Sequence, residues 1–371
     1  MNILINTSNL RTGGGLQVAD SIIRMLNRYK EHTFFVVIPE MLDATGADVS
    51  GNSNVRIIPY SQPLSLYSIL TGRNRILDKI VEINNIEAVL TIFGPSRWKP
   101  RCFHLCGFAM PHIALPESPY WKSLSIASLL KSKLRVLLMK RDFKKNNDIL
   151  WCENEYISQR LRQLFKGKRV NTITNNYNQI FDNPEEWDYS IKLPQFDGAT
   201  LITITAAYPH KNLQIALSAL EEIKRIDPQF KVRFVFTINQ NQYPTVPDKF
   251  KENFVFLGPV SICQCPALYR QSDMMFQPSL LECFSATYAE AMKMEIPIIT
   301  TDLGFAHSLC GDAAIYYSST DAHDLAKCII ALWSDKRKRD KLVANGKKQL
   351  QVFDSAESRT HKLVKIIENN I

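Results

Sequence analysis

The chain has 371 residues, of which 45% are hydrophobic and 22% charged, and its formal net charge is +9. This length fits two domains of ordinary size, and the composition is that of a globular chain and not of a disordered one. No run of about eighteen apolar residues is free of charge, which argues against a membrane-spanning helix. The amino terminus has no basic leader before its first apolar run, so a cytoplasmic protein is expected.

Charge and cysteine content narrow the possible partners. Nearly all the positive excess lies in residues 1–187, and such a basic half can attract nucleic acid, anionic lipid or phosphorylated substrates. We expect no nucleic-acid partner, because the chain has no nucleic-acid motif and no interleaved aromatic platform. The eight cysteines have no Cys-x-x-Cys spacing and no histidine cluster beside them, so reduced thiols and no metal ion are expected.

Short apolar runs alternate with helical patterns along the first half of the chain. Residues 2–6 predict a buried strand, which is followed by a glycine-rich turn and a helix over residues 16–29. Further strands are predicted at 33–38, 55–58, 88–92, 101–105 and 170–174, and a further helix at 155–164. Strands that alternate with helices favour a parallel, doubly wound sheet.

A second alternating series begins with a predicted strand at residues 200–204. Residues 175–195, rich in Asn, Asp and Pro, are typical of an interdomain linker. Helices are predicted at 212–226, 265–271, 285–294, 322–334 and 336–350. The sequence therefore predicts an α/β protein with two doubly wound domains, in which ligands bind at the carboxyl ends of the strands.

Two glutamates, Glu282 and Glu290, lie on either side of a helix start predicted near Phe284. A strand, a small-residue loop and a helix amino terminus form a socket for phosphate, because the first N–H groups of the helix have no intrahelical partners. A carboxylate one or two turns into that helix can accept hydrogen bonds from ribose hydroxyls. The alternative is a chance spacing of two glutamates.

The stretch from Pro278 to Met292 resembles the signature of the retaining GT-B-fold glycosyltransferases that use nucleotide sugars, where seven residues separate two glutamates. Residues 296–302 and Gly311-Asp312-Ala313 continue the pattern. The resemblance implies two facing Rossmann-like domains with a cleft between them. It implies an acceptor-binding domain over 1–180, a nucleotide-sugar-binding domain over 181–350, and a last helix within 351–371 that returns to the first domain.

Lys211 follows the first strand of the second series. A lysine there could neutralise a pyrophosphate and stabilise the leaving nucleoside diphosphate, whereas the alternative is a solvated lysine at a helix start. In the resembling family this loop carries Arg, four residues and Lys. Lys211 occupies the lysine position, but Ala206 stands at the arginine position. Phosphate stabilisation is therefore expected to rest on Lys211, on helix amino termini and on another basic residue.

The resemblance also implies roles for the neighbouring residues. Glu290 would bind ribose, and Glu282 would face the hydroxyls of the donor sugar. The family often has Glu-Gly-Phe-Gly where this chain has Glu-Cys-Phe-Ser, so the bound donor can be positioned differently here than in the family. The backbone N–H groups that would meet phosphate or sugar belong to Phe284, Ser285 and Ala286. The loop that would contact the nucleobase through main-chain atoms, without separating UDP- from GDP-sugars, contains Gly258, Pro259 and Val260.

Two features of the first half are further candidates. Gly13, Gly14 and Gly15 open a helix after the first strand, so their N–H groups can converge on an anion, although tight packing is the alternative. Their position matches the glycine-rich loop of the resembling family, beside the donor phosphates. His104 resembles a catalytic histidine that the family places near the donor sugar. A hydrogen-bonded core histidine is the alternative reading, and His112 is the rival candidate.

Residues 120–147 combine leucines with lysines and arginines. A basic amphipathic helix can lie on anionic lipid, whereas the alternative is an ordinary surface helix with a solvated basic face. Members of the resembling family that act on lipid-linked sugars often dock by such a surface. Peripheral contact with the inner face of the plasma membrane is therefore our hypothesis for this segment.

The resemblance implies a metal-independent, retaining glycosyltransferase that needs no cofactor. Its partners would be a UDP- or GDP-sugar and a saccharide or lipid-linked saccharide, as in bacterial O-antigen or capsule synthesis. A sugar-nucleotide epimerase of the same fold and a non-catalytic nucleotide-sugar-binding scaffold are the alternatives. A dinucleotide oxidoreductase is disfavoured, because the Gly13-Gly14-Gly15 run is not the Gly-x-Gly-x-x-Gly fingerprint.

Overall fold

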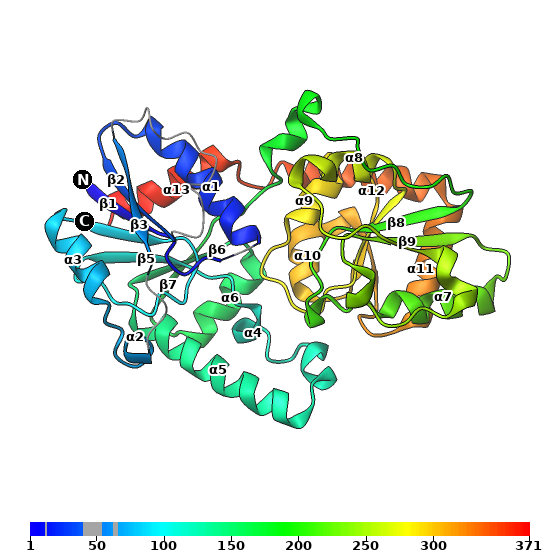
Figure 1. Cartoon of the computed structure of the whole chain (residues 1–371), viewed down its shortest axis with the longest axis horizontal. Helices are drawn as coiled ribbons and strands as arrows, with labels where there is room; N and C mark the ends of the chain where they lie inside the picture. The colour runs from blue at the N-terminus through cyan, green and yellow to red at the C-terminus, as the bar shows by residue number, and fades with distance from the viewer. Residues whose placement is uncertain (12, 40–53, 62–65) are drawn as a thin grey trace. The chain divides into compact units, whose positions relative to one another are not determined.

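The computed structural model describes residues 1–11, 13–39, 54–61 and 66–371, which form two compact α/β units (Figure 1). The first unit consists of Met1–Pro116, Leu124–Asn175 and Asp354–Ile371, and the second of Glu117–Ser123 and Asn176–Phe353. The boundary expected after residue 180 thus lies close to the break after Asn175. Residues 117–123 join the second unit, which nothing in the sequence had indicated.

The first unit is built on a parallel sheet of seven strands in the order β3-β2-β1-β4-β5-β6-β7. Their bounds are β1 Asn2–Asn6, β2 Thr33–Pro39, β3 Val55–Tyr60, β4 Ala88–Thr91, β5 Phe103–Gly107, β6 Ile149–Cys152 and β7 Arg169–Thr172. Side chains alternate across a strand, so Ile3 and Ile5 pack with one apolar cluster and Leu4 with the other. The direction of winding reverses between β1 and β4, and a ligand crevice is expected at the carboxyl ends of these two strands.

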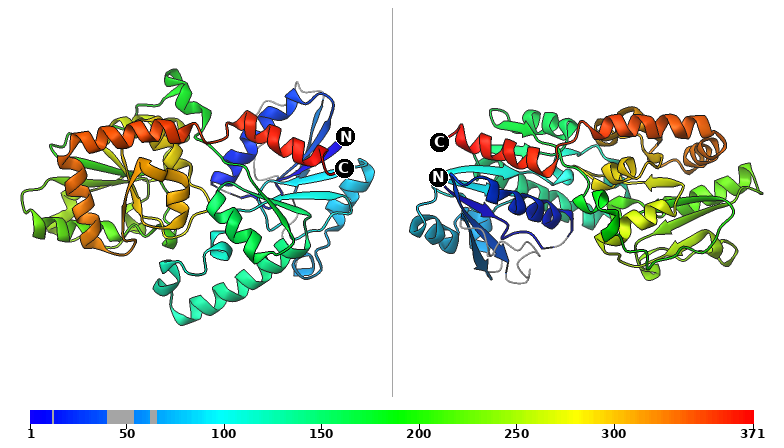
Figure 2. Two further views of the ribbon diagram at one scale, coloured as in Figure 1. Left: turned by 180° about the vertical axis from the view of Figure 1, so that it is seen from behind. Right: turned by 90° about the horizontal axis from the view of Figure 1, so that it is seen from above.

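Helices cover both faces of this sheet. The cluster around Ile3 and Ile5 includes apolar side chains of α1 and of the last helix, α13, which lie side by side in Figure 2. The cluster around Leu4 includes Leu77 of α3. The helices of this unit are α1 Gly14–Met25, α2 Leu66–Thr71, α3 Arg75–Ile83, α4 Pro111–Ala114, α5 Ile126–Lys145, α6 Glu155–Leu164 and α13 Ala356–Glu368.

The second unit is built on a parallel sheet of six strands in the order β10-β9-β8-β11-β12-β13. Their bounds are β8 Ala199–Thr203, β9 Val232–Phe236, β10 Phe254–Phe256, β11 Met274–Gln277, β12 Ile298–Thr301 and β13 Ala314–Tyr317. The helices are α7 Ile215–Ile226, α8 Cys265–Arg270, α9 Ala286–Lys293, α10 Gly304–Cys310, α11 Ala322–Ser334 and α12 Lys336–Leu350. Here the winding reverses between β8 and β11, so the loops after these two strands flank the expected crevice.

Residues 175–195 were predicted to be the interdomain linker, and the structure assigns them from Asn176 onward to the second unit. The segment contains two short 3₁₀ helices, Gln179–Asp182 and Pro184–Glu186. Phe181 is fully buried beside Tyr269, and the backbone N–H of Asp188 donates to the Cys263 carbonyl at 2.9 Å. The segment is therefore a fixed part of the second unit.

Two further observations concern the cysteines and the possibility of a membrane-spanning helix. All eight cysteines are free thiols, as expected from their spacing. Within the described part of the chain, no helix is both long enough and apolar enough to cross a bilayer.

Candidate functional site

The candidate site lies at the carboxyl edge of the second sheet, where the loops after β8 and β11 meet. The backbone N–H of Leu280, in the loop after β11, donates to the carbonyl of His210, in the loop after β8, at 2.8 Å. Because the two strands are parallel neighbours, their following loops are bound to emerge on the same edge. One hydrogen bond thus ties together two loops that are distant in the sequence.

Lys211 and Glu282 form an ion pair between these two loops. Lys211 ends a 3₁₀ turn, Pro209–Lys211, and its Nζ donates a short hydrogen bond to Glu282 Oε1. The two side chains are only 14% and 10% exposed. Asn212 then turns the chain in the left-handed region, with φ of 50°. The fold thus brings a cation and a carboxylate, both predicted from sequence, into direct contact. Because the two side chains are largely shielded from solvent, their charge interaction is stronger than it would be in water.

A polar network lies beneath the loop that carries Glu282. Gln277 Nε2 donates to Ser279 Oγ at 3.2 Å and to Ser285 Oγ at 3.3 Å. Thr301 Oγ1 donates to the Ser279 carbonyl at 2.9 Å. Ser285 is the residue before α9, and its hydroxyl also contacts that of Thr287 at 2.8 Å. These bonds fix the loop, so the first N–H groups of α9, from Ala286 onward, are held at the same edge as Lys211.

Glu290 lies inside α9 and is 4% exposed. Tyr269 Oη, from α8, donates to its Oε2 at 3.0 Å. Burial raises the pKa of the Glu290 carboxyl to about 7, although the hydrogen bond from Tyr269 acts in the opposite direction. No cation of the described residues pairs with this buried carboxylate, so a further hydroxyl group that donates a hydrogen bond to it would stabilise its ionised form.

The loop expected to contact a nucleobase follows β10. Gly258 has φ of 73°, a backbone conformation that favours glycine, and an added Cβ would come within 3.0 Å of Asn239 Oδ1. Its N–H donates to the Ile238 carbonyl at 3.0 Å, which ties the loop to the end of β9. Pro259 is exposed and Val260 half-buried, so the loop reaches the surface after the buried Gly258.

Residues 117–123 bring an aromatic group to the site that the sequence analysis did not anticipate. Ser118 Oγ donates to the Leu280 carbonyl at 2.6 Å. The ring of Tyr120 stands edge-on to that of His210 at 6.2 Å, and the ring of Tyr208 stacks on His210 at 5.6 Å. The segment therefore supports both the Lys211 loop and the Glu282 loop.

The glycine run of the first unit lies where the winding of its sheet reverses. Gly13 has φ of 81° and immediately precedes α1. No atom would lie within 4 Å of a Cβ added to Gly13 or Gly14, so packing does not explain these two glycines. A positive φ does explain Gly13, since an L side chain rarely adopts it.

His104 has the position of a core histidine. It is 1% exposed, its Nε2 lies 2.8 Å from Thr91 Oγ1 and its Nδ1 2.5 Å from the Asn146 carbonyl. Burial lowers its pKa to about 4. Both ring nitrogens are occupied inside the first unit, so the alternative reading of this histidine is favoured over a catalytic one. His112, the rival candidate, lies half-buried in α4.

Glu153 is a candidate that the sequence analysis missed. It directly follows β6, at the carboxyl edge of the first sheet, and is 5% exposed. Burial raises its pKa to about 7, against the positive charge of Arg359 and a hydrogen bond with Asn175. An acidic residue just after a buried strand is the signal that could have identified it. Arg359 itself, from α13, donates to Asn175 Oδ1 and to Ser21 Oγ.

A model of a known protein family matches part of the chain. Residues 190–349 match the family model of glycosyl transferases group 1. This range covers most of the second unit and includes Lys211, Glu282, Glu290 and the Gly258 loop, so this part of the chain is similar to the glycosyl transferases group 1. No curated protein matches the sequence significantly.

Solved structures match the whole chain in fold. A glycosyltransferase from Rickettsia africae ESF-5 has a TM-score of 0.68 at 15% identity, covering 99% of this chain and 98% of its own. Sucrose-phosphate synthase from Thermosynechococcus elongatus has a TM-score of 0.73 at 13% identity, with coverages of 99% and 98%. Anabaena HepE, solved in complex with UDP-glucose, has a TM-score of 0.65 at 13% identity and covers 99% of each chain. The fold is thus that of GT-B glycosyltransferases.

Proposed function

We propose that the protein transfers a sugar from a nucleotide-sugar donor to a saccharide acceptor, with retention of the anomeric configuration. In this reaction the bond from the anomeric carbon to the phosphate oxygen breaks, and a bond to an acceptor hydroxyl oxygen forms on the same face. The acceptor proton passes to the leaving phosphate. The Lys211–Glu282 pair at the reversal point of the second sheet is the observation that carries the proposal.

Lys211 would stabilise the leaving diphosphate. As negative charge develops on the phosphate, a lysine already held at the site offers a cation without a large change in position. Its ion pair with Glu282 keeps the side chain there before the donor arrives. The N–H groups at the start of α9 would add positive potential in the place of the arginine that Ala206 replaces. We propose no metal ion for this step.

Glu282 and Glu290 would hold the two sugars of the donor. Glu282, once Lys211 turns to phosphate, can accept hydrogen bonds from hydroxyls of the transferred sugar. Glu290 would accept hydrogen bonds from ribose in its ionised form, and the raised pKa of its carboxyl makes that ionisation depend on the ligand. The HepE complex with UDP-glucose supports a uridine nucleotide as the first donor to test, and a guanosine nucleotide as the second.

The test is thermal stabilisation and transfer measured on the whole protein. UDP, GDP, CMP, TDP and NAD are compared by thermal shift, and the sugar nucleotide of the stabilising base is then used with saccharide acceptors. One nucleoside diphosphate should raise Tm, and Lys211→Ala and Glu290→Ala should abolish the rise. Lys231→Ala and Glu295→Ala, at exposed positions of the same unit, are the matched controls. Absence of any shift would count for the scaffold alternative, and donor turnover without an acceptor would count for an epimerase.

We further propose a lipid-linked acceptor, reached by docking of α5 on an anionic membrane surface at the cytoplasmic side. No residue of α5 from Ile126 to Leu138 is buried, whereas its last turns are anchored by Phe143, whose ring is tilted against that of Phe108 with the centroids 4.8 Å apart. Apolar side chains line the exposed turns, between 41% and 80% exposed: Ile126, Leu130, Leu134, Leu137 and Leu138. Exposed basic residues flank them: Lys131, Lys133, Arg135, Arg141, Lys144 and Lys145. This combination suits a headgroup layer better than water. A role in O-antigen or capsule synthesis would follow from such an acceptor.

Liposome flotation tests the docking. Vesicles with about 30% anionic lipid should carry the protein, and reversal of charge at Lys140, Arg141, Lys144 and Lys145 should release it. A matched control reverses Lys336, Arg337, Lys341 and Lys348, four lysine and arginine residues exposed on α12. Replacing Leu130 and Leu134 by serine should also weaken binding. Equal flotation of the α5 and α12 variants would overturn the docking proposal and leave the transferase proposal untouched.

A further inference from the structure

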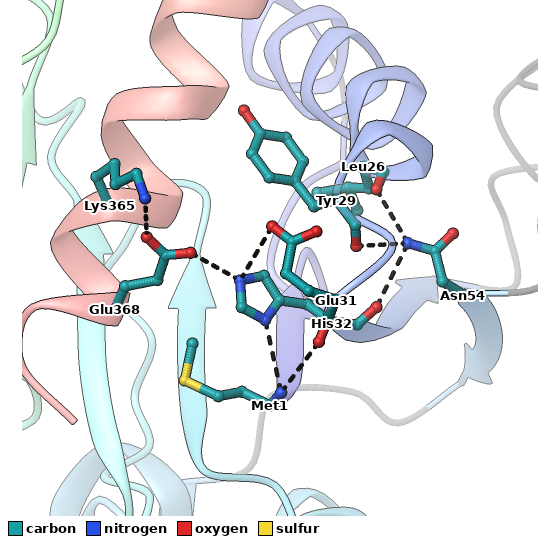
Figure 3. A network of polar contacts seen from close by, with 8 residues as sticks. All are labelled: Met1, Leu26, Tyr29, Glu31, His32, Asn54, Lys365 and Glu368. Atoms are coloured by element: carbon teal, nitrogen blue, oxygen red, sulfur yellow. Dashed lines mark hydrogen bonds and ion pairs between the residues drawn. The ribbon is translucent and has the colours of Figure 1, made fainter.

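A second cluster of chemically active side chains lies in the first unit, at the amino ends of β1 and β2 (Figure 3). The imidazole of His32 lies between the carboxylates of Glu31 and Glu368. Its Nε2 is 3.0 Å from Glu368 Oε1 and 3.8 Å from Glu31 Oε1. The three ligand atoms, one from each residue, all lie within 4.8 Å of one another. Both carboxylates thus converge on a single ring nitrogen.

These separations suit a small divalent cation. Zinc binds imidazole nitrogen and carboxylate oxygen at about 2.0–2.2 Å, and tetrahedral ligands at that radius lie roughly 3.3–3.5 Å apart. The observed separations of 3.0 and 3.8 Å lie on either side of this value. Glu31 is 59% exposed, so its side chain can rotate. A small rotation would bring its Oε1 closer to His32 Nε2 by the few tenths of an ångström that a bound zinc ion requires.

The histidine is held in place before any ion arrives. It is 6% exposed, and its ring stands edge-on to Phe34 at 6.0 Å. The turn that carries it is fastened by Asn54, whose Nδ2 donates to the carbonyls of Leu26, Tyr29 and His32, as Figure 3 shows. A rigid imidazole lowers the entropy cost of forming a metal site.

We propose that Glu31, His32 and Glu368 bind a divalent cation of the zinc class, with water as the fourth ligand. Imidazole with carboxylates is a donor set suited to Zn²⁺ and neighbouring transition metals, and less to Mg²⁺. The ion would join the last turn of α13 to the start of β2. Since the carboxyl edges of the sheets are where the ligand crevices are expected, an ion at the amino edge serves stability and not sugar transfer.

Lys365 is the competitor that the ion must overcome. Its Nζ lies 2.6 Å from Glu368 Oε2, whereas Oε1 faces the imidazole. The ion can therefore bind through Oε1 while the lysine keeps Oε2. The remaining ring nitrogen, Nδ1, lies 3.5 Å from the Met1 amino nitrogen.

The test uses the full chain, treated with chelator and then titrated with ZnCl₂ by calorimetry. We expect one equivalent bound with a Kd in the micromolar range, and a rise in Tm of about 5 °C at a hundredfold excess over Kd. Glu368→Gln and His32→Asn should each weaken binding at least tenfold. Glu31→Gln changes an exposed side chain and so tests the site even where a buried substitution harms folding.

His307 and His323 provide matched controls. Each pairs with one carboxylate, Asp302 at 2.6 Å and Glu222 at 3.0 Å, and neither belongs to a three-ligand group among the described residues. His307→Asn and His323→Asn should therefore leave the high-affinity equivalent unchanged. Equal zinc binding by wild type and Glu31→Gln, or no binding at 100 μM ZnCl₂, would mean that the cluster is only a hydrogen-bonded ion network.

Discussion

Each unit holds a buried glutamate whose carboxyl pKa is raised to about 7, but their surroundings differ. Glu153 in the first unit lies in the field of Arg359, which comes from the last helix. Among the described residues, Glu290 in the second unit has only the hydroxyl of Tyr269 as a side-chain hydrogen-bond donor. A carboxylate balanced by a permanent cation contributes to structure, whereas one held by a neutral donor keeps capacity for a ligand. The comparison predicts that Glu153 has a structural role and that Glu290 binds a ligand.

The largest expected effect comes from removing the cation of the first unit. Arg359→Met leaves Glu153 buried without its nearest positive charge and deletes the bonds to Asn175 and Ser21. We expect a loss of about 3 kcal/mol in the free energy of unfolding, measured by urea denaturation. The double variant with Glu153→Gln should recover part of it, because the neutral amide no longer needs a cation. A loss below about 0.5 kcal/mol would remove the distinction between the two glutamates.

Removing the cation of the second unit should affect turnover more than stability. Lys211→Ala should lower kcat about a hundredfold, or roughly 2.7 kcal/mol of transition-state stabilisation. Tm should change much less than in Arg359→Met. Lys231→Ala, which pairs with an exposed aspartate, should keep full activity. A large rise in KM with unchanged kcat would contradict a role for Lys211 in stabilising the leaving group.

The pH dependence of nucleotide binding should distinguish Glu290 from Glu153. The pKa of Glu290 lies above its ordinary value, so the free protein holds a proton there below pH 7. A nucleotide that needs the ionised carboxylate must displace this proton, and its affinity should fall up to about tenfold per pH unit below 7. Glu290→Gln should bind more weakly and lose this dependence. Calorimetry at pH 6 and pH 8 measures both effects, and Glu153→Gln should retain the wild-type dependence.

The same two glutamates should also be visible in stability. For each, the pKa in the folded state is above the unfolded value near 4.5, so the folded protein takes up a proton in the window from about pH 4.5 to 7. Their contribution to stability is therefore full at low pH and is lost as the pH rises through 7. Replacing either by Gln should flatten the stability curve across this window in chemical denaturation. A wild-type curve that rises there and is unchanged by both substitutions would contradict the burial of these charges.

The smallest effect is expected at the segment that joins the second unit from the first half of the chain. Ser118→Ala removes the bond to the Leu280 carbonyl, at a cost of about 1 kcal/mol. We expect a rise of about fivefold in KM for the donor with little change in Tm. Ser123→Ala, whose hydroxyl donates only to Tyr120 in the same segment, is the control. An equal effect of both substitutions would indicate general loosening of the segment and not support of the site.

The regular elements were predictable because apolar runs carry a local signal. The strand at Asn2–Asn6 and the helix at Glu155–Leu164 were predicted to the residue. The pair of Lys211 and Glu282 could be proposed from sequence because each follows a buried strand in a parallel sheet. Their direct contact was not predictable, since it depends on the packing of two loops. The same reason hid the contribution of Ser118 and the field of Arg359 on Glu153, which join distant parts of the chain.

For His104 and for residues 175–195, the sequence pattern is compatible with two different structures. A histidine within a short apolar strand gives the same pattern whether the ring faces solvent or the interior, and only packing against Thr91 and Asn146 decides between them. A segment rich in Asn, Asp and Pro gives the same pattern whether it is free or fixed. Here Phe181 and Trp187 are the two large buried side chains that fix it.

The last helix has a consequence for synthesis. Leu363, Val364 and Ile367 complete the apolar cluster of the first unit, yet they are synthesised after the whole of the second unit. The second unit consists of Glu117–Ser123 and Asn176–Phe353, so all of its residues are synthesised before α13 and its fold can be completed earlier. The domain that begins at the amino terminus is therefore the one whose core is completed last, and a chain truncated before Asp354 would contain an intact second unit beside an incomplete first one.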